Sequence, residues 1–389
     1  MKFKFDQIAI NSTAKKKPEP KDAANYVGLE HLTPGTFEIS EWGSSVPPVG
    51  EKLLMKKGDV LFGRRRAYQR KVGIAPFDGI FSAHGMVLRP RTEVVDENYF
   101  PFFISSDQFM NEAVRISVGS LSPTINWGTL KNCEFDLPPM EEQKKVAELL
   151  WAANDLKEKY KKAIIATDEM LKAKFREMFG RGDVSRGDAE ERSKWPRVHL
   201  RDVCFGRASN GYFARQSEYN SDGNARIVCV TDVVNRTYVN IDELQRISIS
   251  SNDLSRFSLK YGDMLFCRSS LVKEGIGKAA IIASSEINDC VFECHLIKIS
   301  IDTNICHPVF MEHLSWAAEF RKQIMENSKT TTMTTISQDG ILNVSIPLPP
   351  LSLQREFVAI AEKADAAKSA LKKSIADIEQ VMKGLINGQ

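Results

Sequence analysis

Several features that define other protein classes are scarce in this 389-residue chain. No run approaches the roughly 20 consecutive apolar residues of a membrane-spanning helix, so we expect no membrane partner. The seven cysteines are odd in number and form no Cys-x-x-Cys pair, which favours reduced thiols over a disulfide framework. The first residues, Met1 to Asp6, lack the apolar core of a secretory signal. These features predict a cytoplasmic protein.

The chain also lacks an excess of one charge and any recognisable catalytic motif. Lysine and arginine number 53 and acidic residues 50, a balance that neither requires nor excludes nucleic acid. Gly275 to Lys278 resembles the end of a phosphate-binding loop, but Ala279 stands where magnesium needs Ser or Thr. In one continuous strand, Cys290 and Cys294 would face away from His295, so a metal site is not expected. We expect no catalytic residue, no metal and no cofactor on this chain.

What the chain does contain is a copy of itself. Gly58–Phe62 recurs as Gly262–Phe266, an offset of 204, and matches from Phe81 onward keep an offset of 211. The change in offset predicts a seven-residue insertion after the second of these segments. The later matches pair His84 with His295, Leu137-Pro138-Pro139 with Leu348-Pro349-Pro350, and Gln143 with Gln354. A repeat of this length is a duplicated domain together with the segment that follows it.

Each repeated domain is predicted to be rich in strands. Short apolar runs bounded by Gly, Pro, Asn and Asp, which are typical of strands, occupy 59–62, 86–89, 226–230 and 292–301. Aromatic and aliphatic residues at helical spacing predict one helix in each domain, over 99–116 and 308–325. The fold class is therefore α+β.

A long helix is predicted after each proline pair, because Gly and Pro almost vanish there and apolar residues recur at steps of three and four. We expect the two helices to pack as an antiparallel coiled coil with pseudo-two-fold symmetry; the alternative is that each packs on its own domain alone. The predicted domains are a first recognition domain (1–137), a first spacer helix (138–180), a linker (181–195), a second recognition domain (196–347) and a second spacer helix (348–389). Two similar heads on a rod could measure duplex DNA at two unlike half-sites.

Basic and polar loops after equivalent strands are the strongest candidates for DNA contact. Arginine suits phosphates and guanine edges, and glutamine suits adenine. The alternative is that these loops are solvated basic turns. The first loop offers Arg64, Arg65, Arg66, Tyr68, Gln69, Arg70 and Lys71, and the second offers Arg268, Ser269, Ser270 and Lys273.

Further candidates are small hydroxyl-bearing and basic segments, which could also be ordinary turns. They comprise Ser120 and Ser122, the matching Lys329 and Thr331, and Arg207, Ser209 and Asn210. His84 and His295 are expected to be packed or hydrogen-bonded histidines within strands.

The segments around the proline pairs, FDLPPMEEQKKVA at 135–147 and IPLPPLSLQREFV at 346–358, carry a family resemblance. With YVGLEH at 26–31 and SPTINW at 122–127, they make the chain similar to the DNA specificity (S) subunit of Type I restriction-modification systems. The first domain lacks the Trp-Pro-x-Val-x-Leu sequence that opens the second at Trp195.

The resemblance implies a subunit that does no chemistry and recognises a bipartite, asymmetric sequence in double-stranded DNA. Two methyltransferase (M) subunits would dock on the helices, bind S-adenosylmethionine and methylate adenine. Two restriction (R) subunits, using ATP and magnesium, would translocate and cleave unmodified DNA.

A rival interpretation is a non-enzymatic coiled-coil adaptor whose two heads bind proteins. An adaptor would show little salt-dependent affinity for duplex DNA, whereas a DNA reader would lose affinity steeply as salt rises.

Overall fold

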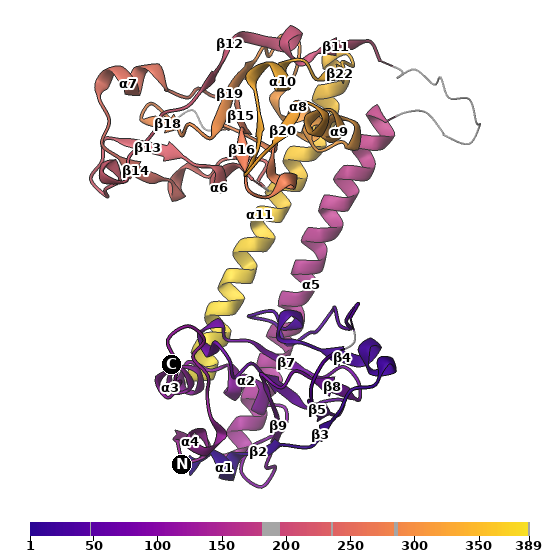
Figure 1. Cartoon of the computed structure of the whole chain (residues 1–389), viewed down its shortest axis with the longest axis vertical. Helices are drawn as coiled ribbons and strands as arrows, with labels where there is room; N and C mark the ends of the chain where they lie inside the picture. The colour runs from indigo at the N-terminus through magenta and orange to yellow at the C-terminus, as the bar shows by residue number, and fades with distance from the viewer. Residues whose placement is uncertain (47, 181–194, 235, 284–286, 388–389) are drawn as a thin grey trace, which may run out of the picture. The chain divides into compact units, whose positions relative to one another are not determined.

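The computed structural model describes residues 1–46, 48–180, 195–234, 236–283 and 287–387. All of the predicted linker except Trp195 lies outside these residues. Contacts divide the chain into two compact units, Met1–Ala163 with Ala370–Gln389, and Ile164–Ser369. In each unit a mixed domain accompanies parts of the two long helices (Figure 1). No helix in the described part of the chain is long and apolar enough to cross a membrane.

The first unit contains two four-stranded sheets and one strand pair. One sheet has the order β2(Ala9–Ser12), β9(Met86–Pro90), β6(Val60–Phe62) and β7(Val72–Ile74). The other has the order β3(Lys15–Lys16), β5(Lys52–Met55), β8(Gly79–Phe81) and β4(Tyr26–Val27), with β4 and β8 parallel. The pair joins β1(Lys2–Lys4) to β10(Glu134–Asp136). The helices are α1(Phe5–Ile8), α2(Phe100–Ser105), α3(Asp107–Arg115) and α4(Trp127–Leu130).

The second unit repeats this plan. Its four-stranded sheet has the order β12(Cys204–Asn210), β19(Leu296–Ile301), β15(Asp263–Cys267) and β17(Ala279–Ile281). A second sheet has the order β14(Gln245–Ile247), β13(Ala225–Val228) and β18(Cys290–Phe292). Two smaller groups are β16(Ser269–Ser270), β21(Thr334–Ile336) and β20(Ser328–Thr330), and the pair β11(Arg197–His199) and β22(Ser345–Pro347). The helices are α6(Val230–Val233), α7(Ser251–Arg256), α8(Pro308–Ser315), α9(Ala318–Glu326) and α10(Gln338–Leu342).

Strand register confirms the duplication. Leu61 of β6 faces Val87 of β9, and their equivalents Leu265 and Lys298 face each other in β15 and β19. The predicted single insertion is wrong, because the seven extra residues are divided between two turns. Comparison of β6 with β7, and of β15 with β17, places three in the first loop. The other four precede β18.

The first domain has the opening strand that its sequence did not predict. Leu137 donates its N–H to the Met1 carbonyl at 2.9 Å, and Leu348 does the same to Pro196 at 2.9 Å. Residues 1–5 are therefore the structural counterpart of 196–200. Phe5 and Leu200, which end the two segments, are both fully buried. A strand of this kind needs alternation and a buried anchor rather than a particular sequence.

Three predicted elements are broken in the structure. The helix over 99–116 divides into α2 and α3 at Ser106, whose backbone is extended and whose hydroxyl accepts the Phe109 N–H. The helix over 308–325 divides into α8 and α9 at Ala317, which is also extended. The run 292–301 turns at 293–295, where the Leu296 N–H reaches the Glu293 carbonyl at 3.0 Å. Local caps and turns override hydrophobic spacing at these points.

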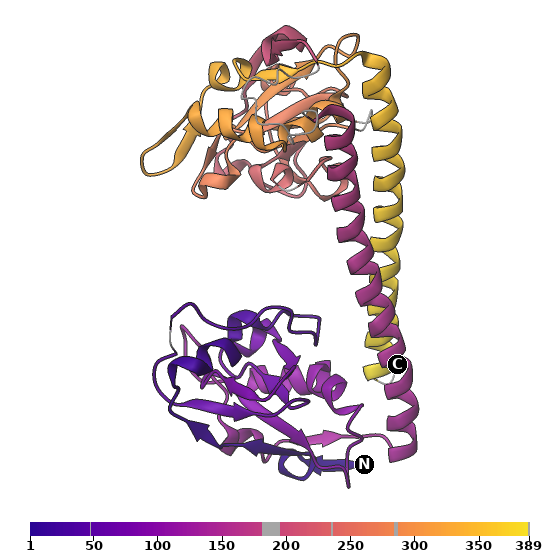
Figure 2. The same cartoon turned by 90° about the vertical axis from the view of Figure 1, so that its right-hand side faces the viewer.

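The two long helices, α5(Met140–Phe179) and α11(Leu351–Asn387), run antiparallel within each unit. Ala147 and Leu150 share the first unit's core with Met382, and Lys157 approaches Glu379 at 4.0 Å. In the second unit Phe179 packs on Phe357, with ring centroids 5.7 Å apart. Figure 2 shows the two helices side by side in each unit.

A buried glutamine at the start of each long helix joins it to the preceding domain. Gln143 accepts the Asp96 N–H at 2.9 Å and donates to the carbonyls of Val94 and Pro138. Gln354 makes the equivalent bonds with His307, Ile305 and Pro349. The Pro-Pro-x-x-x-Gln motif thus fixes the angle at which each helix leaves its domain.

Candidate nucleic-acid interface

In the first domain, the basic loop after β6 and the segment around Ser122 lie together. The Arg65 guanidinium donates to the Ser122 hydroxyl at 3.3 Å, and the Arg66 N–H donates to the Pro123 carbonyl at 2.7 Å. The Ile125 N–H donates to the Arg64 carbonyl at 3.0 Å. Two segments predicted separately from sequence are therefore parts of one surface. Ser120 is exposed beside Ser122 on it.

Three of the predicted cations on this surface are held by the protein itself. Arg64 is half-buried and donates to the Ala83 carbonyl at 3.0 Å, while Lys71 donates to the Leu29 carbonyl at 2.7 Å. Arg70 pairs with Asp107 at 2.5 Å and bonds Asn111. The Arg70 hydrogen bond is the main cause that lowers the pKa of Asp107. These three cations therefore make contacts within the protein that stabilise the loop.

Arg65, Arg66 and Tyr68 are exposed, as is the paired Arg70, and Gln69 is half-buried. Arg66 adopts the left-handed backbone region with φ of 56°. Its guanidinium has no hydrogen-bond or ion-pair partner among the residues that the structure describes. A strained backbone that displays an unpaired cation is typical of a ligand-contacting position.

The second domain builds the same surface with fewer charges. The Arg268 guanidinium donates to the Cys294 carbonyl at 3.3 Å, and the Ile336 N–H donates to the Arg268 carbonyl at 3.0 Å. These bonds match those of Arg64 in the first domain. Ser269 and Ser270 then pair with β21. Lys273 is exposed on the following turn, and Lys329 and Thr331 are exposed on and beside β20.

The third candidate segment, residues 207–210, contacts this surface through one hydrogen bond. Asn210 accepts a hydrogen bond at 3.2 Å from Gln338, which lies two residues beyond the end of β21. Ser209 pairs with Lys298 in the sheet, and Arg207 is exposed in the bulge between Phe205 and Ser209. Arg207 is the candidate here with the freest access to a ligand.

Sequence reasoning misplaced two histidines. His84 and His295 were expected to be packed or hydrogen-bonded within strands, but both lie in turns and are exposed. The hydrogen-bonded part of the expectation holds for His295, whose Nδ1 lies 2.6 Å from the Ser269 hydroxyl. The turn at Cys294 and His295 also removes the strand argument used against metal binding; in the described ranges no group of three or more His, Cys, Asp and Glu is placed to hold a metal. The signal that could have found the histidines was their recurrence at the same offset in both copies.

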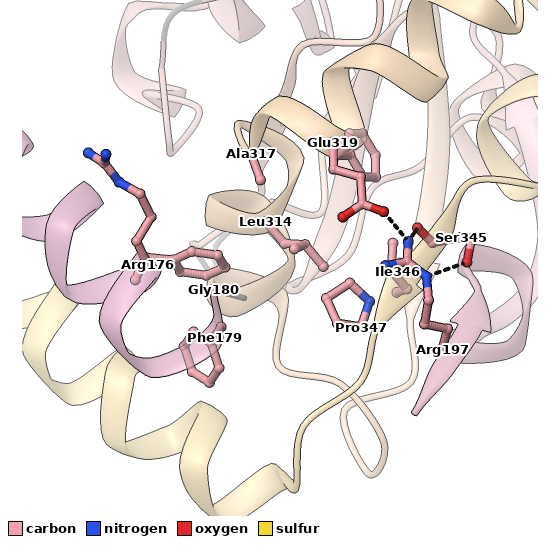
Figure 3. A pocket seen from close by; sticks show the side chains of 12 residues that line it. Arg176, Phe179, Gly180, Arg197, Leu314, Ala317, Glu319, Ser345, Ile346 and Pro347 are labelled. Carbon is pink, nitrogen blue, oxygen red and sulfur yellow. Dashed lines mark hydrogen bonds and ion pairs between the residues drawn. The ribbon is translucent and has the colours of Figure 1, made fainter. Parts of the chain in front are cut away.

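The second unit contains a pocket, which Figure 3 shows from close by. Its lining includes Phe179, Leu314 and Ile346, and the ion pair between Arg197 and Glu319 measures 2.9 Å. None of the predicted DNA-contact residues lines it. The first unit has the bulkier Phe103 and Phe135 where the second has Leu314 and Ile346.

Comparison with known proteins identifies the class. The family model described as the Type I restriction modification DNA specificity domain matches residues 7–167 and again 192–380. The chain belongs to this family and carries two copies of its domain. The resemblance inferred from the proline-pair motifs is confirmed.

Individual relatives agree with this assignment. The chain is 25% identical over 315 residues to the Type I restriction enzyme EcoKI specificity subunit of Escherichia coli K12, covering 77% of this chain and 65% of that protein. It is 24% identical over 344 residues to the StySPI specificity subunit of Salmonella potsdam, covering 85% and 70%. The first alignment thus spans less than two thirds of the relative's length.

Solved structures share the fold. The crystal structure of a Type I S subunit from M. genitalium matches with a TM-score of 0.59 at 12% identity, over 99% of this chain and 94% of that one. A chain from a study of the assembly of the Type I R-M system matches with a TM-score of 0.53 at 18% identity, over 100% and 96%. The predicted α+β class, with two strand-rich domains and long helices, is confirmed.

Proposed function

We propose that this chain is the DNA-reading subunit of a Type I restriction-modification complex, with one domain for each half of a bipartite, asymmetric target. The observation that carries the proposal is the repeated surface described above. The hydrogen bonds of Arg64 and of its counterpart Arg268 form the same frame in both domains. The next two residues are Arg65 and Arg66 in the first domain and Ser269 and Ser270 in the second. The same backbone arrangement with different side chains suits two unlike half-sites, because side-chain chemistry discriminates base edges.

The long helices would dock two methyltransferase subunits and set the spacer between half-sites. Leu149 and Leu156 of α5, both in the first unit, are exposed by 58% and 41% and lie seven residues apart. This spacing gives one apolar stripe on the helix, which suits a partner helix. S-adenosylmethionine would be bound by these partners, and ATP and magnesium by the restriction subunits. The chain itself would supply recognition in the cytoplasm and no catalysis.

The decisive experiment is single-molecule sequencing of adenine methylation in cells that express this chain with and without its candidate methyltransferase. We expect a split motif of two short, unlike halves that appears only when both proteins are present. An Arg65→Ser, Arg66→Ser variant should change only one half of that motif. Absence of any new motif, with the methyltransferase active beside another specificity chain, would favour the adaptor interpretation.

A further inference from the structure

The duplication separates what the two domains share at the candidate interface from what they do not. The shared residues are Arg64 with its counterpart Arg268, and His84 with its counterpart His295. At the next two positions the first domain has Arg65 and Arg66, whereas the second has serines. Two domains that read unlike half-sites need different side chains for bases, but the sugar-phosphate backbone is the same in both half-sites.

In both domains the basic loop donates a backbone hydrogen bond to the carbonyl of the shared histidine, although the donors lie one position apart, because Arg65 corresponds to Ser269. The Arg65 N–H donates to the His84 carbonyl at 3.3 Å, and the Arg268 N–H donates to the His295 carbonyl at 2.8 Å. The guanidinium of Arg64, or of its counterpart Arg268, donates to the carbonyl of the residue just before each histidine, Ala83 or Cys294. These bonds use the main chain of the turn, so the imidazole remains exposed in both copies.

The surroundings of His84 favour an anion. Burial first, and then the charges of Arg65, Arg64 and Lys52, lower its pKa. Lys52 and His84 also line one surface hollow with Ser82, and one carboxylate, that of Glu30, lines it too. The three cations Arg64, Arg65 and Lys52 outnumber the one carboxylate of Glu30, and an excess of positive charge stabilises a phosphate oxygen.

The second copy shows how the imidazole can be oriented. The Ser269 hydroxyl lies 2.6 Å from the His295 Nδ1, and among the described residues Nε2 has no hydrogen-bond partner. A neutral imidazole whose Nδ1 accepts from a hydroxyl carries its proton on Nε2, where it can be donated to a ligand.

We propose that His84 and His295 are equivalent phosphate contacts, which anchor each recognition domain on the DNA backbone independently of the sequence that it reads. This inference rests on the proposed function and adds to it a division of labour. The histidine and the arginine behind it set the position of the domain, and the residues that differ between the copies discriminate the bases.

The test compares single variants of the full-length chain, bound to its methyltransferase partner, on two duplexes. One carries the target motif found by sequencing and the other has both halves scrambled. We expect His84→Ala and His295→Ala each to weaken binding about five- to tenfold on both duplexes. Because a neutral imidazole releases no counterion, each variant should leave the slope of log affinity against log salt nearly unchanged. His84→Gln, which keeps a neutral donor, should recover part of the affinity.

His199→Ala is the matched control, because His199 is exposed but lies outside the candidate interface; it should leave affinity unchanged. A loss confined to the target duplex would overturn the proposal in favour of base reading, and no loss on either duplex would also overturn it. If the unaltered complex shows no salt-dependent binding to any duplex, the proposed function itself fails. Circular dichroism of each variant separates loss of contact from loss of folding.

Discussion

The two recognition domains differ most where their backbones agree best. After β6 and β15 the main chain bonds to the histidine turn through donors one position apart, and it makes the same bond to the segment that ends at Ile125 or Ile336. Yet the first domain places Arg65 and Arg66 on this frame, and the second places Ser269 and Ser270. The frame is carried by backbone groups and by one guanidinium, so the remaining side chains are free to vary. The bases that a domain recognises can therefore change through these side chains without any change in the fold.

The buried supports of the frame follow the same pattern. Asp59 binds the guanidinium of Arg89 through two bonds, of 2.6 and 2.8 Å. Its counterpart Asp263 accepts from the Ser300 hydroxyl at 2.5 Å, and both aspartates also cap the backbone three residues earlier. A buried carboxylate needs hydrogen-bond partners, but a guanidinium and a hydroxyl can each serve. Asp59 and Asp263 therefore have the same structural role, although their hydrogen-bond partners differ.

The largest effect is expected from breaking the glutamine contacts that both units share. Gln143 and Gln354 are 1% and 0% exposed, and each makes three hydrogen bonds. Gln143→Leu or Gln354→Leu would leave a buried N–H and two carbonyls without partners, which should cost about 2 to 4 kcal/mol. Hydrogen exchange should show faster opening only in the unit that contains the replaced glutamine.

Gln380→Leu is the control for these variants, because Gln380 lies on the same helix as Gln354 but is exposed. It should change stability by less than about 0.5 kcal/mol. Equal acceleration of exchange in both units by either variant would refute the view that each glutamine serves only its own unit.

A smaller effect should distinguish two lysines at equivalent positions of the long helices. Lys157 donates to the Gly35 carbonyl at 2.7 Å and lies 4.0 Å from Glu379. Burial, and then the charge of Lys161, lower its pKa. Lys368 lies 2.7 Å from both Asp168 and Asp365. Burial alone would lower its pKa, but these two carboxylates raise it.

Replacing each lysine with methionine should therefore give unequal results. Lys157→Met keeps the buried aliphatic part of the side chain and removes a charge that burial disfavours. It should therefore change the free energy of unfolding by less than about 1 kcal/mol. Lys368→Met leaves two carboxylates without their cation and should cost about 2 kcal/mol. Because the pKa of Lys368 is raised, its contribution is complete below the unfolded value and is lost only as the pH rises through the folded one.

Denaturant unfolding at pH 7 measures both variants, with exposed Lys372→Met as the control. Equal losses would show that the two sites are energetically alike despite their different partners.

The sequence predicted the features that depend on repetition and periodicity. Duplication and both long helices follow from motifs that recur at fixed offsets, and the loops of the candidate interface occupy equivalent places in the two domains. The break at Ser106 was not predicted, because the aromatic spacing of α2 and α3 continues across a residue that caps the second helix. The opening strand β1 and the buried Phe5 that follows it were missed because they match their counterparts in burial and not in sequence. Which cations remain free was also unpredictable, since the partners of Arg70 and Lys71 are distant in the chain.

The smallest effect concerns backbone strain, and it compares two arginines of the same loop. Arg66 and Arg70 both adopt the left-handed region, with φ of 56° and 51°. Arg66→Gly removes this strain and no described side-chain contact, so the first unit should gain about 0.5 kcal/mol after the greater freedom of unfolded glycine is included. Arg70→Gly gains the same relief but loses Asp107 and Asn111, and should be neutral or slightly destabilising.

Thermal unfolding of both variants, with DNA affinity measured in parallel, tests whether the strain at Arg66 serves binding. We expect Arg66→Gly to be more stable than the unaltered chain and to bind the target duplex several-fold more weakly. If Arg66→Gly were instead destabilised as much as Arg70→Gly, its guanidinium would have a structural partner. A variant that gained stability with unchanged affinity would remove Arg66 from the interface and leave Arg65 as the cation that distinguishes the first domain from the second.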